Sequence, residues 1–435
     1  MQFLLDRLMA ELKLGRKAVL MVALGAMFYV YEFFLRVAPG ALTHELMRDL
    51  HLNAFSLSIM SACFFYAYAP LQIPAGLLCD SIGPRKSLTI AVAICGLATI
   101  LFAHSSFAWQ GSIARFFMGA ASSLAFVGPL ALAARWLPQK YFALAAGAVQ
   151  LMGALGAMVG GGPIAAVSQD IGWREAIMYV GIAGLFLMIF FAIFLRDGPT
   201  KIRYESQFFA RFKATWHQLL EFCCNRQVWA IGAASLACWA PMAIFAELWG
   251  GPFLVSAYHL NSVTASSAIS WVWIAVVIGS PFGGWWSDKI GQRCLPLIIF
   301  YSIGFIASLM LIYCHFQNMF MLNLALFMFG LTSAAQPVTF GLIADIAPKK
   351  IMGAAVGFNN MCVIAGATIL QPLVGYILQK NWNHQMIDNA PMYGTSEYQH
   401  ALLVLPIVSL IGIIAAKFLI KETSCKSIFT ELQPD

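Results

Sequence analysis

Charged residues are scarce in this 435-residue sequence: Asp, Glu, Lys and Arg make up 10% of it, against roughly 25% in soluble globular domains. The sequence also lacks a phosphate-binding Walker loop, a CxxC pair, a catalytic triad and the His/Cys spacing of a metal site. These absences argue against an ATP-driven pump, a metal site and an integral-membrane enzyme. We therefore predict no enzymatic activity, no metal and no bound cofactor.

Hydrophobic residues make up 60% of the chain. A helix needs about 20 apolar residues to cross a bilayer, and windows of that length recur along the whole sequence. The sequence therefore predicts an all-α polytopic membrane protein. Twelve transmembrane helices are expected, at residues 18–39, 55–79, 86–104, 109–134, 141–168, 174–195, 227–255, 264–287, 294–314, 318–344, 351–379 and 400–420.

The positive charges predict the orientation. If the N-terminus is cytoplasmic, 21 of the 26 Lys and Arg residues fall in cytoplasmic segments and three fall outside. Cytoplasmic loops of membrane proteins carry such an excess of Lys and Arg. We expect both termini in the cytoplasm, and we attribute the net charge of +7 to topology and not to a nucleic-acid partner.

One loop motif occurs twice, 208 residues apart, each time between two predicted spans. The first copy contains Gly76, Asp80, Gly83, Arg85 and Lys86, and the second contains Gly284, Asp288, Gly291 and Arg293. Glycine permits the tight turn, and an aspartate at a helix end can meet the positive N-terminus of another helix. We predict a gate made by these charges, and the alternative is that they only set topology and end helices.

The duplication extends beyond the loop. An offset of 210 residues pairs Gly147 with Gly357 and Gln150 with Asn360. The chain therefore divides into an N-terminal six-helix half at 1–195, a cytoplasmic central loop at 196–226, and a C-terminal six-helix half with a short cytoplasmic tail at 227–435. Because six is even, the halves run parallel across the membrane, and substrate sites of such repeats lie near the midplane at the repeat interface.

The motif Gly-x3-Asp-x2-Gly-x-Arg-Lys resembles the signature loop of the major facilitator superfamily. Arg115-x3-Gly119 is similar to that family's second motif, and the span-five series from Gly153 to Pro163 resembles its glycine-proline motif. The resemblance implies the major facilitator fold, in which two six-helix halves alternate access to a central site. Ser81 and Cys294 depart from the pattern, since the family usually has a basic residue at both positions.

Four ionisable residues fall within predicted spans: Glu32, Arg36, Arg115 and Glu247. Such residues are costly in a bilayer and are usually functional. Spans one, four and seven, which carry them, line the cavity in the family that the chain resembles. Arginines suit a carboxylate or phosphate, and glutamates suit an amine or a proton. We predict a substrate- and proton-binding site made by these four residues.

Two aromatic residues, Tyr29 and Phe33, lie closest to the Glu32/Arg36 side of span one and are expected at the same site. Two other interpretations stay open. Glu32 and Arg36, one helical turn apart, can form a self-neutralising structural pair. Arg115 can serve general coupling in place of substrate choice.

The predicted function is secondary active transport of a small polar solute across the bacterial inner membrane by a monomer. Residues 31–39 resemble span one of phagosomal-transporter-type amino-acid importers of intracellular bacteria, which favours proton-coupled uptake of an amino acid or small peptide, with H⁺ as the coupling ion. The alternatives are transport of an organic anion or carboxylate siderophore, and drug-type efflux. A solute receptor that does not transport is a fourth interpretation.

Overall fold

The computed structural model describes residues 16–138, 141–198 and 208–427. Twelve helical segments among these residues are long and apolar enough to cross a membrane, and each of the twelve predicted spans overlaps one of them. The largest difference between predicted and observed ends is five residues, at the start of the last span, which begins at Thr395. The predicted all-α, twelve-helix fold class is confirmed.

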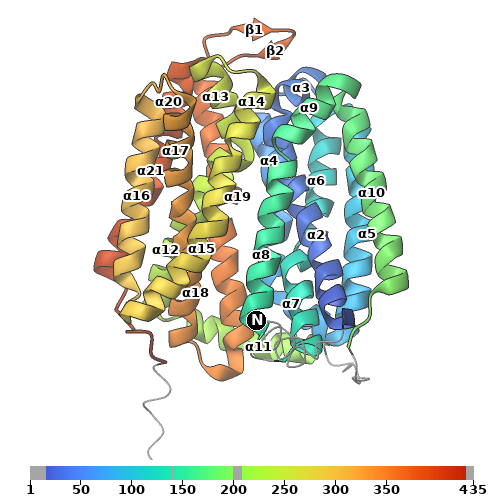
Figure 1. Cartoon of the computed structure of the whole chain (residues 1–435), viewed down its shortest axis with the longest axis vertical. Helices are drawn as coiled ribbons and strands as arrows, with labels where there is room; N and C mark the ends of the chain where they lie inside the picture. The colour runs from blue at the N-terminus through green and yellow to red at the C-terminus, as the bar shows by residue number, and fades with distance from the viewer. Residues whose placement is uncertain (1–15, 139–140, 199–207, 428–435) are drawn as a thin grey trace, which may run out of the picture.

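The N-terminal six spans form one side of the molecule (Figure 1). Their helices are α2 (Arg16–Ala41), α4 (Ala54–Ile82), α5 (Pro84–Ala103), α6 (Ala108–Ser122) with α7 (Leu124–Trp136), α8 (Phe142–Val159) with α9 (Gly162–Ile171), and α10 (Trp173–Phe194), and the short α3 (Thr43–Asp49) follows α2. Helix α11 (Phe208–Cys223) lies in the segment predicted as the central loop.

The C-terminal six spans form the other side (Figure 1). Their elements are α12 (Arg226–Pro241) with η2 (Met242–Trp249) and α13 (Gly250–Tyr258), α14 (Ser262–Ala268) with α15 (Ser270–Ile290), α16 (Cys294–Tyr313), α17 (Met319–Gly330) with η3 (Leu331–Ala334) and α18 (Ala335–Ile346), η4 (Lys349–Ile351) with α19 (Met352–Lys380), and α20 (Thr395–Leu402) with α21 (Val404–Ile414) and η5 (Ala415–Leu419). Strands β1 (Met386–Ile387) and β2 (Ala390–Pro391) pair antiparallel.

The two ends of the molecule differ. We call the end that carries the β1–β2 hairpin the hairpin face, and the opposite end, where α2 begins and α11 lies, the α11 face (Figure 1). Towards the hairpin face the halves pack closely: a β-carbon added at Gly40 of α2 would lie 2.6 Å from the carbonyl oxygen of Glu247 in η2. The hydroxyl of Tyr393, beyond β2, also accepts the N–H of Ala54 at the start of α4, at 2.9 Å.

Towards the α11 face the halves separate around two cavities. The first, of about 420 Å³, is lined by residues of α2, α8, α12, α15, α18 and α19, among others, and we call it the central cavity. The second, of about 390 Å³, shares Phe126, Phe340, Val356 and Asn360 with it and extends to Cys79 and Gly353, near the α11-face ends of α4 and α19. The structure is therefore closed at the hairpin face and hollow towards the α11 face.

Helix α8 packs directly against the backbone of α2 at Gly156. A β-carbon added at Gly156 would lie against the carbonyl of Val30, closer than van der Waals contact allows, whereas one at Gly147 would meet nothing within 4 Å. This close packing fixes the rotation of α2, which carries four of the predicted site residues: Tyr29, Glu32, Phe33 and Arg36.

Replacing Gly156 by Ala should therefore destabilise the protein by about 1–3 kcal/mol, because an inserted methyl group forces backbone shifts in a packed interface. Gly147→Ala is the matched control on the same helix, and it should be neutral or stabilising by up to about 1 kcal/mol, since alanine favours helix. Thermal unfolding of both purified variants measures the difference. Equal melting temperatures would contradict the packing described here.

Candidate functional site

The four charged residues predicted within spans meet at the centre of the molecule. The Nη2 atom of Arg36 lies 2.9 Å from Oε1 of Glu247, and its Nη1 atom lies 3.6 Å from Oε1 of Glu32. All four side chains, Arg115 included, are buried, with at most 2% of any residue exposed. Because Arg36 belongs to α2 and Glu247 to η2, the shorter of these ion pairs joins the two halves.

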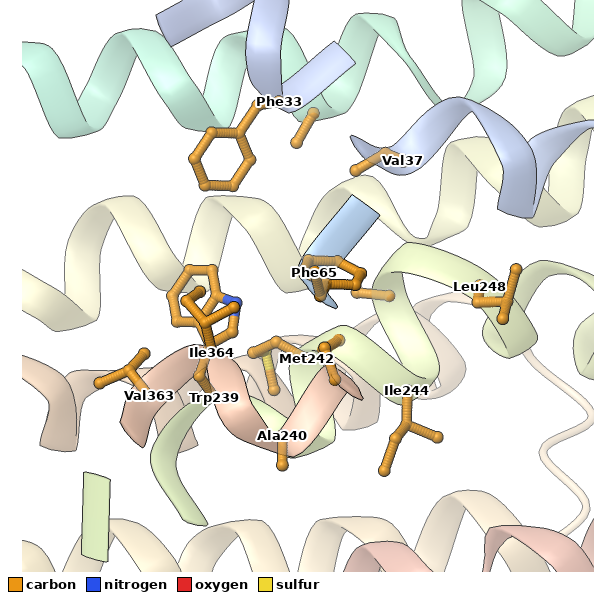
Figure 2. Close-up of a cluster of buried hydrophobic side chains, with 14 of the residues drawn as sticks. Phe33, Val37, Phe65, Trp239, Ala240, Met242, Ile244, Leu248, Val363 and Ile364 are labelled. Atoms are coloured by element: carbon orange, nitrogen blue, oxygen red, sulfur yellow. The ribbon is translucent and has the colours of Figure 1, made fainter. Parts of the chain in front are cut away.

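Aromatic rings surround the Arg36 guanidinium. Its central carbon lies 4.9 Å from the ring centre of Phe33, 5.2 Å from Phe65, 5.9 Å from Tyr68 and 5.5 Å from Trp239. Ring faces attract cations, more strongly when water is excluded. Figure 2 shows Phe33, Phe65 and Trp239 within the same apolar cluster. The rings therefore help the two glutamates to hold a positive charge in a buried site.

Glu247 is held by an irregular helix. Residues Met242–Trp249 of span seven form a π-helix. This geometry is rare in proteins overall, but where it occurs it is often at a functional site. The Nε2 atom of Gln371 in α19 donates to the carbonyl of Ala243 at 2.7 Å. Trp239, three residues before the π-helix begins, donates from Nε1 to Oε1 of Glu247 at 3.2 Å. One carboxylate oxygen of Glu247 thus meets both Arg36 and Trp239.

Arg115 lies apart from the cavity wall. Its Nη1 atom donates to the carbonyl of Leu35, and its guanidinium lies 4.7 Å from the ring centre of Phe64. Its Nε and Nη2 atoms have no hydrogen-bond partner among the described residues. Arg115 is close enough to Glu32 and Glu247 to interact electrostatically with both. With two arginines and two glutamates, the cluster has no formal net charge.

Three of the six predicted site residues line the central cavity: Tyr29, Phe33 and Arg36. Glu32, Glu247 and Arg115 are buried behind its wall. Arg36 is the one charged side chain that lines either cavity in the part of the chain that the structure describes. The cavity therefore presents a single cation to a solute.

Several other residues of the wall are not among the six predicted site residues. Tyr68 and Trp239 line the central cavity beside Arg36, and Gln150, Ser280, Gln336 and Asn360 add polar groups. The repeat had paired Gln150 with Asn360 at an offset of 210, and this was the one signal in the sequence that marked two of these positions.

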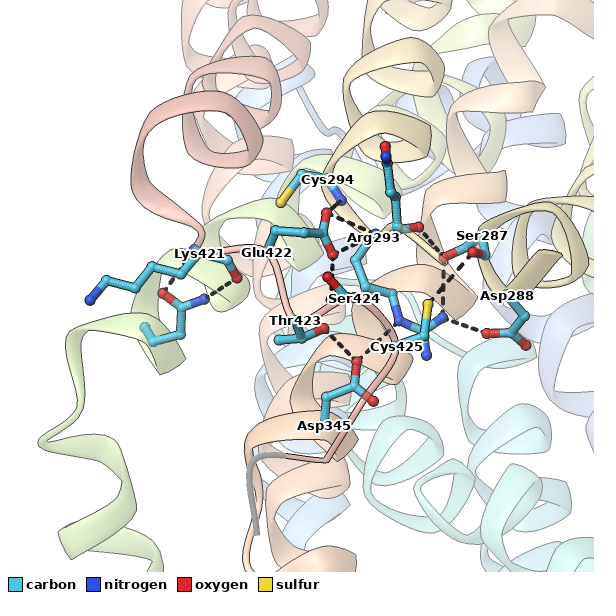
Figure 3. A network of polar contacts seen from close by, with 12 residues as sticks. Ser287, Asp288, Arg293, Cys294, Asp345, Lys421, Glu422, Thr423, Ser424 and Cys425 are labelled. Carbon is cyan, nitrogen blue, oxygen red and sulfur yellow. Dashed lines mark hydrogen bonds and ion pairs between the residues drawn. The ribbon is translucent and has the colours of Figure 1, made fainter. Parts of the chain in front are cut away.

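The two loop motifs form separate networks. Arg293 donates from Nη1 to Oδ1 of Asp288 at 2.7 Å and from Nε to Oδ2 of Asp345 at 3.1 Å (Figure 3). Its backbone N–H and that of Cys294 donate to the carboxylate of Glu422, at 2.8 Å in each case. This network ties the chain after the last span to the start of α16.

The first motif has the corresponding arrangement. The backbone N–H of Arg85 donates to Oδ1 of Asp197 at 2.7 Å, and its Nη2 atom donates to the carbonyl of Ala192 at 2.6 Å. Lys86 is exposed, and the side chain of Asp80 lies outside the described part of the structure. The described contacts of both arginines stay within their own half, at the face where the halves are apart. The predicted gate therefore stays a prediction.

The glycines of the motifs have the expected conformations for tight turns. Gly83 has a φ of 87° and Gly291 a φ of 65°. A residue with a β-carbon is strained at such positive φ values, whereas glycine is not. Gly76 and Gly284 lie within α4 and α15, where Gly284 faces Pro337 of α18.

Comparisons with known proteins agree with the twelve-helix fold. The sequence model of the family described as Major Facilitator Superfamily matches residues 20–251 and 249–430. The chain is 24% identical to the probable sulfoacetate transporter SauU of Cupriavidus necator, over 83% of this chain and 87% of the relative. It is 24% identical to the membrane sensor protein UhpC of Escherichia coli, over 88% and 90% of the two chains.

A further relative is the probable galactarate/D-glucarate transporter GudP of Escherichia coli, 22% identical over 77% of this chain and 81% of the relative. Among solved structures, a bacterial homologue of the human lysosomal transporter Spinster, inward-facing and unoccupied, superposes with a TM-score of 0.71 at 14% identity. That match covers 97% of this chain and all of the other. At such identity the likeness concerns the fold.

The ion pairs of the cluster lead us to expect different stabilities for variants of Arg36 and Glu247. Arg36→Gln leaves Glu32 and Glu247 without their shared cation, and breaking a buried ion pair typically costs about 3–5 kcal/mol. Glu247→Gln should lower the stability less, because Arg36 keeps its ion pair with Glu32. The double variant Arg36→Gln/Glu247→Gln should be more stable than Arg36→Gln alone in thermal unfolding. A double variant less stable than both single variants would contradict the pairing.

The Glu422 network predicts a pH dependence. Burial alone would raise the pKa of Glu422, but the N–H groups of Cys294, Arg293 and Ser424 lower it below its ordinary value of 4.5. A carboxylate with a lowered folded pKa stabilises the fold above its unfolded pKa, and this contribution is lost as the pH falls through the folded value. Glu422→Gln should therefore melt below wild type at pH 7, and the gap should close on acidification below pH 4.5.

Glu221→Gln, an exposed change on α11, is the control for the preceding experiment and should follow the wild type at every pH. A gap between Glu422→Gln and wild type that stays constant with pH would show that the carboxylate charge is not what stabilises this network.

Proposed function

The chain belongs to the major facilitator superfamily and is a secondary transporter of that type, and we propose that it moves a small organic anion across the bacterial inner membrane together with protons. We further propose that the α11 face is cytoplasmic, as the positive charges predict, so that the structure is open inwards. The solute would bind in the central cavity with its anionic group at Arg36.

The observation that carries this proposal is the charge of the cavity wall. Arg36 lines the central cavity, and no carboxylate of the described residues does. A guanidinium binds carboxylate, sulfonate or phosphate groups through paired N–H donors. Two relatives are named for anionic solutes, sulfoacetate and galactarate/D-glucarate. These points favour an organic anion over the amino acid that the sequence favoured.

Proton coupling follows from the neutrality of the cluster. An anion that approaches Arg36 competes with Glu247, 2.9 Å away, and leaves an excess negative charge in a medium of low dielectric constant, which is costly. A proton taken up by Glu247 removes that excess and frees Arg36 for the solute. The anion and the proton therefore favour one another's binding, which is what symport requires.

An amino acid or small peptide is the second candidate. Tyr29, Phe33, Tyr68 and Trp239 line the cavity, and aromatic faces can hold an ammonium group. A solute receptor is the third, because one relative is named a membrane sensor protein. Binding without accumulation in vesicles would favour the receptor.

Uptake into proteoliposomes tests the proposal. Purified protein in vesicles with an inward-directed proton gradient, acidic outside, should accumulate at least one radiolabelled solute from a panel of sulfoacetate, D-glucarate, glycerate, alanine and dialanine. Accumulation of anions with no uptake of the two zwitterions supports the first candidate. Uptake of the zwitterions alone would replace it with the second.

Glu247→Gln should keep exchange of labelled for unlabelled solute but lose accumulation driven by a pH gradient, by about tenfold or more. The amide keeps the shape of the side chain and cannot carry the proton. Glu175→Gln, an exposed change at the start of α10, is the control and should accumulate solute as wild type does. Normal gradient-driven accumulation in Glu247→Gln would remove Glu247 from the proton path.

A further inference from the structure

The repeat relates four polar residues at the cavity walls. The offset of 208 residues between the loop motifs pairs Gln72 with Ser280, and the offset of 210 pairs Gln150 with Asn360. Gln72 lies on α4 and Asn360 on α19, while Gln150 lies on α8 and Ser280 on α15. Helices α4 and α19 are neighbours across the interface of the halves, and so are α8 and α15. The symmetry of the repeat thus predicts two equivalent polar bridges.

Only the first bridge is formed among the described residues. The Nδ2 atom of Asn360 donates to Oε1 of Gln72 at 2.7 Å. On the other side, Gln150 accepts the hydroxyl of Tyr29 at 3.3 Å, and the Oγ atom of Ser280 has no partner in the described chain. Ser280 is nevertheless 91% buried, since 9% of it is exposed.

Ser280 is unusual among the hydroxyl residues of these helices. A buried Ser or Thr in a helix commonly donates to a carbonyl three or four residues earlier, as Thr99 and Ser308 do at 2.7 Å. Ser58, Ser280 and Ser409 are buried serines whose hydroxyls make no such bond in the described residues. Of these three, Ser280 alone lines the central cavity. A buried hydroxyl without a partner is costly, and here it faces the space that a solute would occupy.

We propose that Ser280 and Gln150 determine specificity by hydrogen-bonding hydroxyl groups of the solute whose anionic group binds Arg36. The transporter then prefers hydroxylated organic acids to the same acids without hydroxyl groups. This inference rests on the proposed function, because it needs an anion in the central cavity.

The chemistry of the two side chains fits this role. Ser280 offers a donor and an acceptor, and Gln150 keeps its amide N–H donors while its oxygen accepts from Tyr29. Both residues line the same cavity as Arg36. A site built to hydrogen-bond a substrate hydroxyl rejects the analogue that lacks it, because the buried polar groups of the site are then left unpaired.

The test compares matched pairs of acids by isothermal titration calorimetry on the purified full-length protein. D-glucarate and adipate share one carbon chain and two carboxylates, and glycerate and propionate share one carbon chain and one carboxylate. Wild type should bind the hydroxylated member of at least one pair about tenfold more tightly or better, the effect of one good hydrogen bond. Ser280→Ala should bring that ratio close to one by weakening the hydroxylated acid alone.

Two further variants sharpen the result. Gln150→Met removes the amide at similar side-chain length and should also lower the ratio. Ser409→Ala removes a buried hydroxyl that also has no partner in the described residues but does not line the central cavity, so it should keep the wild-type ratio.

The failures of the two proposals are distinguishable. Binding of the acids that depends on Arg36, with no preference for hydroxylated members or with an unchanged ratio in Ser280→Ala, overturns this inference and leaves the anion site intact. No binding of any of the four acids or of sulfoacetate to wild type, or equal binding of the acids to wild type and to Arg36→Gln, overturns both.

Discussion

An arginine inside the hydrocarbon layer must be neutralised by its neighbours, and the centre of this molecule is built around that requirement. A charge at the middle of a bilayer costs several kcal/mol even on lenient scales. Arg36 meets the requirement with Glu32 from its own helix, Glu247 from the other half, and aromatic rings on several sides. The charged group that lines the central cavity is therefore also an ion pair between the halves, so a change at Arg36 and a change in the contact between the halves cannot be independent.

The sequence predicts the twelve spans well because length and apolar composition suffice to recognise a membrane helix. It also singles out the four charged residues within spans, because burying a charge in a bilayer is costly whichever way the side chain faces. These residues are Glu32, Arg36, Arg115 and Glu247. Which side chains line the cavity is harder to predict. Ser280 and Trp239 lie on helices that are apolar all round, so no amphipathic pattern fixes the rotation that turns them inwards.

Two further features escape sequence analysis for physical reasons. The π-helix from Met242 to Trp249 depends on partners such as Gln371, 128 residues further along the chain than the carbonyl of Ala243 that it binds. Two acidic residues cap α5 and α16, and each follows the last span of its half by three residues: Asp197 and Glu422. The repeat thus extends into the segments after the spans, where hydropathy gives no signal.

The neutrality of the four-residue cluster has an electrical consequence. Moving one elementary charge through a membrane potential of 100 mV involves about 2.3 kcal/mol, but two arginines and two glutamates together carry none across the field. These four residues therefore add no voltage dependence to a reorientation of the empty protein. Under the proposed symport, a solute with one negative charge and one accompanying proton also moves no net charge, so the pH gradient alone would set its accumulation. A doubly charged solute with one proton carries a net negative charge inwards, and the negative interior of the cell opposes it.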